Sequence, residues 1–177
     1  MTNQAPLTPA SEPSARSQDS GRKARDDGGS LYKVILVPID FSESSNRTLQ
    51  FATHIAIREN AIIWLLHVFR VPDYAVTQFG WGPKDCRSAE QEAEANLIAV
   101  EKEVLSRGIK AKACFRVGHP FEEIVSMAND PEVDLVLIGS HGCSAIKQLF
   151  LGSTAARVVE RARCPVMVVK ERFPSDT

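Results

Sequence analysis

Glycines and hydroxyl residues gather in one stretch of the chain, between residues 139 and 154. Gly139, Gly142 and Gly152 allow close approaches that a side chain would block, so the stretch can bring several N–H groups to one anion. Ser153 and Thr154 stand at the expected start of a helix, where free amides and the helix dipole favour a phosphate. We therefore predict a phosphate site, although the stretch is neither a Walker loop nor GxGxxG. The alternative is that Gly142 and Gly152 serve tight turns and Ser153 is an ordinary N-cap.

A carboxylate, Asp40, follows the apolar run 34–37. Ligands of open parallel sheets bind beyond the carboxyl ends of strands, so we expect Asp40 at the same edge as the glycine stretch. There its oxygens could accept hydrogen bonds from ribose hydroxyls or from a base amine. The alternative is that Asp40 caps its own loop or the helix that follows, and the residues alone leave both interpretations open.

Two other chemistries use residues expected at this edge. His67, His141 and Cys143 suit a soft metal, but loop residues separate them, and we expect His67 to pack at a strand end and His141 to line the phosphate loop. Ser153, His141 and Asp40 can be combined into a hydrolytic triad, yet any chain of this length offers such triples, and no GxSxG elbow occurs. We predict no catalytic residue and no metal ligand.

Apolar runs and helical periodicities alternate along the chain. A continuous apolar run at residues 34–37 predicts a parallel strand covered on both faces. Further apolar-rich stretches at 61–68, 111–117, 133–138 and 165–169 predict four more strands. Amphipathic stretches lie between them, including a helix over 88–107 capped by Gly108. Residues 70–85 show no clear period and predict a mobile loop. Helices between successive strands imply right-handed crossovers, hence a doubly wound, three-layer α/β domain with a five-stranded parallel sheet.

Composition limits the other possibilities. The 177 residues carry 21 Lys and Arg against 22 Asp and Glu, a net charge of −1, which offers no footprint for nucleic acid or an anionic membrane. The longest apolar run, 61–66, is far short of the roughly 20 residues of a membrane span. Four cysteines without metal-site spacing indicate reduced thiols, and we expect a cytoplasmic protein.

The N-terminal segment differs from the rest. Residues 1–30 contain three prolines and three glycines but no valine, isoleucine or aromatic residue, which is typical of a disordered tail. We therefore predict one folded domain over residues 31–172 and a short C-terminal tail at 173–177.

Several ordered motifs resemble the universal stress protein family. Gly139-x-x-Gly142, nine residues and then Gly152-Ser153 resemble the nucleotide loop of these proteins, and the stretches 34–42, 65–68, 117–120 and 164–169 match in the same order. The resemblance covers roughly residues 31–171. It implies a Rossmann-like sheet of strand order 3-2-1-4-5 and a homodimer through the last strand (166–169). It also implies that ATP, ADP or AMP binds with Mg²⁺ at the edge of the sheet where the strand order reverses. The glycine motif marks the ATP-binding branch.

The resemblance also implies roles for individual residues. Pro38 and Asp40 would meet adenine and ribose, and Val68 would line the base. Ile138, also expected at the site, stands where some nucleotide-binding members have methionine, a volume-conserving change that should be tolerated. Ribose and phosphates would be held by Gly139, Gly142, Gly152, Ser153 and Thr154.

The implied function is a nucleotide-binding stress-response regulator with little fast catalysis. Its alternatives are a slow ATPase and a nucleotide-free, chaperone-like interaction protein. We expect an alanine at position 142 or 152 to weaken nucleotide binding more than folding, because its methyl would project where phosphate oxygens approach.

Overall fold

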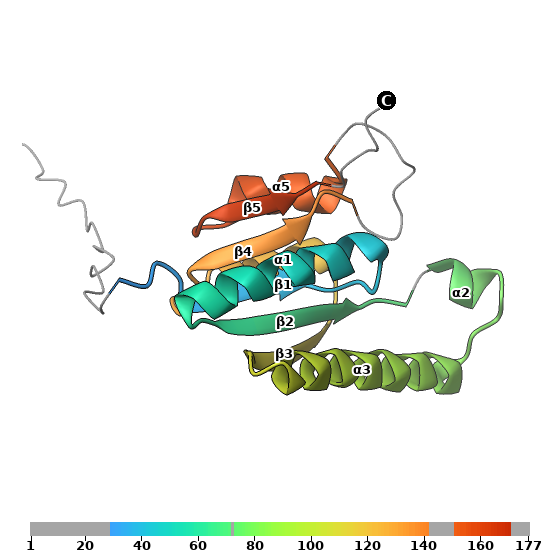
Figure 1. The fold of residues 1–177 in the computed structure, drawn as a ribbon. Coiled ribbons are helices and arrows are strands. Elements are labelled where there is room, and N and C mark those ends of the chain that lie inside the picture. Colours follow the sequence, from blue (N-terminus) through green and yellow to red (C-terminus); the bar gives the residue numbers. More distant parts are fainter. Residues whose placement is uncertain (1–28, 72, 142–150, 171–177) are drawn as a thin grey trace, which may run out of the picture.

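The chain forms one five-stranded parallel sheet with helices on both faces (Figure 1). The computed structural model describes residues 29–71, 73–141 and 151–170. The sheet order is β3-β2-β1-β4-β5, so the predicted Rossmann-like fold and strand order are confirmed. The strands are β1 (Val34–Pro38), β2 (Ile62–Phe69), β3 (Lys110–Val117), β4 (Leu135–Gly139) and β5 (Val166–Val169), and the helices are α1 (Glu43–Glu59), α2 (Asp73–Thr77), α3 (Pro83–Ser106), α4 (Pro120–Ala128) and α5 (Ser153–Arg161).

Two apolar cores, one on each face of the sheet, hold the layers together. Alternate residues of a strand point to opposite faces, so Ile35 and Val37 of β1 enter the core under α1 and α3. Val34 and Leu36 enter the other core, under α4 and α5. The central strands are thus buried on both sides, which is why they are continuous apolar runs. The strand bounds differ from the predicted ones by at most two residues.

The segment 70–85 is more ordered than expected. It contains α2 and the first turn of α3, which begins at Pro83 rather than at residue 88. Pro83 suits the first helical position, and the carboxylate of Asp85 accepts a hydrogen bond from the Gly82 N–H at 2.8 Å. The apolar pattern missed this start because the buried residues of α3 are Leu97 and Val104, several turns later. At the other end, Gly108 adopts a φ of +77°, as expected of a residue that ends a helix.

None of the helices within the described ranges has the length and apolar character needed to cross a bilayer.

The attachment of α3 can be tested by comparing two neighbouring residues. Leu97 is fully buried, whereas Ile98 is 38% exposed. We expect Leu97→Ala to lower the free energy of unfolding by about 2–5 kcal/mol, because it leaves a cavity between α3 and the sheet. Ile98→Ala, the matched control, should lower it by less than about 1 kcal/mol. Urea unfolding followed by circular dichroism measures both, and equal losses would contradict the placement of α3.

Candidate functional site

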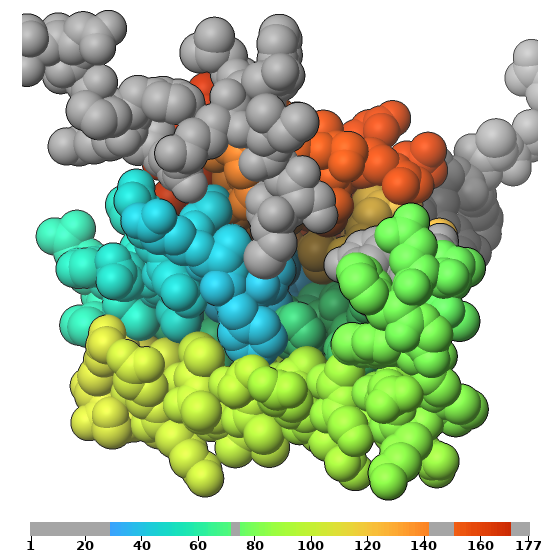
Figure 2. Space-filling model, turned by 90° about the vertical axis from the view of Figure 1, so that its right-hand side faces the viewer, coloured from blue at the N-terminus to red at the C-terminus, as the bar shows by residue number. Residues whose placement is uncertain are grey.

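A pocket of about 520 Å³ lies at the carboxyl edge of the sheet. Figure 2 looks onto this edge, where the surface is hollowed between the α1 and α2 segments. The walls come from the ends of β1, β2 and β4 and from the first turns of α4 and α5. After β1 the chain forms β2 on one side, and after β3 it returns to form β4 on the other. The pocket therefore occupies the switch point at which doubly wound folds bind ligands.

Nine of the ten predicted site residues lie on the wall of this pocket. Three separate segments contribute them, around residues 38–40, 68 and 138–154. They are Pro38, Asp40, Val68, Ile138, Gly139, His141, Gly152, Ser153 and Thr154. Gly142, the tenth, lies outside the described residues.

Some lining residues were missed by the sequence analysis. Leu66 and Arg70 lie two residues before and two residues after Val68. Residues two apart in an extended chain point to the same side, so the prediction for Val68 could have been extended to both. Pro120 and Ile124 come from α4, and no local pattern predicts that this helix borders the site. The remaining lining residues are Ile39, Ser45, Ser140 and Ala155.

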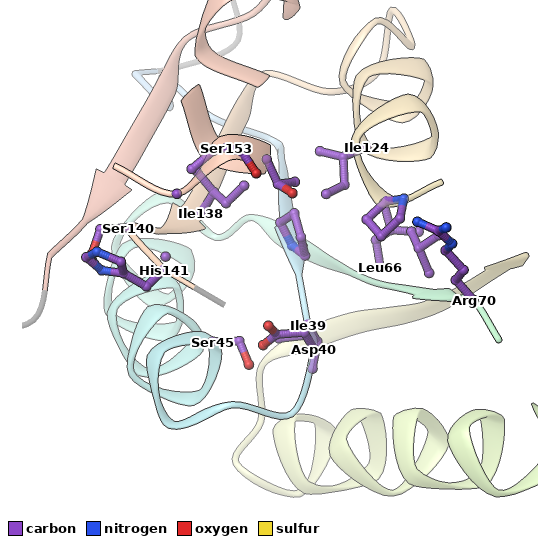
Figure 3. A pocket seen from close by; sticks show the side chains of 17 residues that line it. Ile39, Asp40, Ser45, Leu66, Arg70, Ile124, Ile138, Ser140, His141 and Ser153 are labelled. Atoms are coloured by element: carbon purple, nitrogen blue, oxygen red, sulfur yellow. The ribbon is translucent and has the colours of Figure 1, made fainter. Parts of the chain in front are cut away.

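The pocket wall combines apolar and polar side chains (Figure 3). Leu66, Val68, Ile124 and Ile138 supply branched aliphatic side chains from three different elements. Asp40 lies on the opposite side of the pocket from Ser153 in the close view. Such a site suits a ligand with one flat apolar portion and one portion rich in hydrogen-bonding groups.

The turn after β1 uses Asp40 as a local cap. One carboxylate oxygen, Oδ1, accepts hydrogen bonds from the Ser42 backbone N–H at 3.1 Å and from the Ser42 hydroxyl at 2.5 Å. Ser42 in turn is the N-cap of α1 and accepts a bond from the Ser45 N–H. The capping interpretation of Asp40 is therefore correct. The same side chain borders the pocket, so its cap also orients a carboxylate toward any ligand there.

The first turn of α5 faces the pocket through Ser153, Thr154 and Ala155. The N-cap is Gly152 and Ser153 is the first helical residue, so the alternative of Ser153 as an N-cap is wrong. A glycine has no side chain with which to cap the first amides, and the first turn contains no acidic residue. Among the described residues, no N-cap or first-turn carboxylate neutralises the positive end of this helix, and such an end favours an anion.

Gly139 and Gly152 are required by close packing. A Cβ at Gly139 would lie 2.5 Å from Ser44 Oγ, on a buried face of α1. A Cβ at Gly152 would lie 3.1 Å from the Ser140 carbonyl oxygen, which already accepts the Gly152 N–H at 2.8 Å. A methyl at position 152 would therefore crowd the backbone of Ser140, so Gly152→Ala should affect packing within the protein, and its effect on a bound phosphate stays a prediction.

His67 and His141, the two histidines considered above as metal ligands, have separate surroundings. His67 Nδ1 lies 2.7 Å from the Ile39 carbonyl oxygen, so the expectation that His67 packs at a strand end is confirmed. His141 Nδ1 lies 2.9 Å from Ser140 Oγ. Within ranges 29–71, 73–141 and 151–170, no three His, Cys, Asp or Glu side chains are grouped so that they could hold a metal ion. Cys143 lies outside these ranges.

Comparison with known proteins shows extensive similarity. The model of the universal stress protein family matches residues 31–170. Universal stress protein MJ0577 of Methanocaldococcus jannaschii is 31% identical over 159 residues, with 80% of this chain and 97% of that protein covered. Its solved structure aligns with a TM-score of 0.70 at 34% identity, over 80% of this chain and 98% of that one. A universal stress protein solved in complex with cAMP aligns with a TM-score of 0.51 at 25% identity, over 80% and 98% of the two chains.

The packing of Gly139 gives a stability prediction. Gly139→Ala should lower the free energy of unfolding by about 1–3 kcal/mol, because α1 must move away from β4 to admit the methyl group. Gly82→Ala is a suitable control, since the nearest atom to its Cβ would be at 3.6 Å, and it should have a smaller effect. Urea unfolding measures both. A Gly139→Ala protein as stable as the wild type would show that the two elements are not in close contact.

Proposed function

The chain belongs to the universal stress protein family, and on that premise we propose that its pocket binds ATP or a related adenine nucleotide together with Mg²⁺. The observation that carries the proposal is the convergence of nine predicted site residues from three distant segments on one pocket. The relative solved with cAMP supports an adenine nucleotide as the ligand class.

The apolar side chains of the pocket wall suit the base. Leu66, Val68 and Ile138 offer aliphatic surface against which an adenine ring would be buried. Asp40 would accept hydrogen bonds from the ribose hydroxyls, as its carboxylate borders the same space. The volume of about 520 Å³ falls within the range of roughly 300–1,000 Å³ found for small-molecule sites.

The first turn of α5 suits the phosphates. Its amides and the hydroxyls of Ser153 and Thr154 would donate hydrogen bonds to phosphate oxygens, and Mg²⁺ would accompany the phosphates of ATP. Hydrogen bonds to a charged group contribute about 1.5–3 kcal/mol each. Three or four of them, with burial of the base, reach the roughly 8 kcal/mol of micromolar binding.

We propose a regulatory role rather than fast catalysis. The Asp40 carboxylate accepts a hydrogen bond from the Ser42 hydroxyl, and His141 Nδ1 is hydrogen-bonded to the Ser140 hydroxyl. Both groups therefore stabilise the local structure, and we do not assign them a role as general base. A nucleotide bound here would stabilise the loops at this edge and change what the protein offers to partners under stress. One alternative is slow ATP hydrolysis at the same site, which an assay of phosphate release would detect. The other is a nucleotide-free interaction protein, which an absence of nucleotide binding would favour.

The cytoplasm is the compartment we propose. Of the cysteines among the described residues, Cys86, Cys114 and Cys164, none forms a disulfide, as expected in a reducing compartment. Burial raises the pKa of the Cys114 thiol, which favours its unreactive protonated form.

We also propose a homodimer through β5. This strand forms one edge of the sheet, and an edge strand offers backbone groups to a second chain. Met167 on β5 and Val159 on the adjacent α5 are 37% and 46% exposed. A second copy placed edge to edge would cover this apolar surface.

Calorimetric titration of the full chain with ATP and MgCl₂ tests the nucleotide site. We expect micromolar binding, and we expect Ser153→Ala to weaken it about tenfold or more because one hydrogen bond to a charged phosphate is lost. Ser106→Ala is the matched control, because Ser106 is exposed on α3, away from the pocket wall, and its hydroxyl donates to the Glu103 carbonyl in its own helix.

Other outcomes of the titration would contradict the proposal. Absence of ATP, ADP and AMP binding by the wild type would favour the nucleotide-free alternative. Rapid phosphate release in the same mixture, reduced in Ser153→Ala, would instead indicate an enzyme.

Light scattering after gel filtration tests the dimer. The wild type should have twice the chain mass of 19.5 kDa, and Met167→Glu should be a monomer because it places a charge in the apolar interface. Val117→Glu, on the opposite edge strand, is the control and should remain a dimer, since Val117 is already 59% exposed. A dimer disrupted only by Val117→Glu would place the interface on β3.

A further inference from the structure

We propose that His67 is a positioning residue that holds the Asp40 turn in the orientation needed to bind ribose. The inference rests on the proposed nucleotide function and adds a residue that does not line the pocket. His67 would act through the backbone of Ile39 and through the ring of Phe41, the two neighbours of Asp40 in the chain.

His67 lies on the other face of the sheet from the pocket. Leu66 and Val68, its neighbours on β2, both line the pocket, and successive strand residues point to opposite faces. The His67 ring packs instead against Phe41, at 4.6 Å between ring centroids, and near Phe115, at 5.8 Å. Any effect of His67 on a ligand must therefore pass through the turn.

The turn begins with Ile39, whose two backbone polar groups are both held by β2. Its N–H donates to the Leu66 carbonyl at 2.7 Å, and its carbonyl faces His67 Nδ1 at 2.7 Å. A carbonyl only accepts, so Nδ1 must carry the hydrogen. The Ile39 carbonyl belongs to the planar peptide unit that joins Ile39 to Asp40. The imidazole therefore fixes the direction in which the chain enters Asp40.

The residue after Asp40 is held by the same ring. Phe41 has a φ of +61°, a left-handed conformation that is unfavourable for a bulky side chain. The contact between the Phe41 and His67 rings stabilises this conformation. Asp40 thus lies between Ile39 and Phe41, which both contact the His67 imidazole. The hydrogen bond from the Ser42 N–H to Asp40 Oδ1 closes the turn.

Two variants separate the donor from the ring. His67→Phe keeps an aromatic ring against Phe41 but has no donor for the Ile39 carbonyl. His67→Asn loses the ring but keeps an N–H at the δ position of the side chain. We expect His67→Phe to weaken AMP binding about tenfold and to leave the binding of inorganic tripolyphosphate, which contacts only the first turn of α5, within about twofold. His67→Asn should recover most of the AMP affinity.

The amide of Ser42 gives a readout that needs no nucleotide. Its hydrogen exchange should be faster in His67→Phe than in the wild type and in His67→Asn, while that of Val136 in β4 stays unchanged. Failure of the wild type to bind AMP would contradict the proposed function, whereas the exchange of Ser42 would still test the turn.

Two results would overturn the role of His67. Unchanged AMP affinity and unchanged Ser42 exchange in His67→Phe would show that the turn is held by other contacts. Equal losses for AMP and tripolyphosphate would indicate general destabilisation. If His67→Phe fails to fold, His67→Leu, which also lacks a donor, takes its place in the comparison with His67→Asn.

Discussion

The pocket depends on a close packing arrangement at the carboxyl end of β4. Gly139 leaves no room for a side chain because Ser44 of α1 occupies the adjacent space. One residue later, the Ser140 N–H donates to the Val169 carbonyl and the Ser140 carbonyl accepts the Gly152 N–H. This short segment therefore joins α1, β4, β5 and the start of α5, and it determines the distance between the two sides of the site.

This packing changes the meaning of the glycine motif. Gly142 and Gly152 were expected to make room for phosphate oxygens. Gly142 lies outside the described residues, whereas Gly139 and Gly152 each make room for another part of the protein. Their contribution to a ligand site is indirect, because they place the first turn of α5 beside the ends of β1 and β4. Ser153, Thr154 and the start of this helix then border the pocket. The same glycines can thus be needed for both folding and binding.

The turn after β1 combines structural and ligand-directed roles in a similar way. Asp40 caps the turn that leads into α1, and it does so while bordering the pocket. The left-handed Phe41 beside it is tolerated because β2 supplies contacts through His67. Unfavourable backbone conformations at a site are typical of residues whose position matters more than their local stability.

The layers of the fold, and most of the residues that line the pocket, could be predicted before the structure was known. Strands buried on both faces must be continuous apolar runs, and the alternation of such runs with amphipathic helices leaves a doubly wound sheet as the fold. The order of the strands came from a resemblance rather than from periodicity, because β1 and β4 are both simply apolar. The start of α3 was missed because its fully buried residues, Leu97 and Val104, come several turns later.

Only the tertiary structure decided which distant groups share a wall and which close approaches require glycine. Ile124 reaches the pocket from α4, and Gly152 is crowded by Ser140. His67 binds the Ile39 carbonyl across 28 residues of chain. These contacts depend on the distances between packed helices and strands. Those distances are set by the side-chain volumes of the whole core rather than by any local sequence pattern.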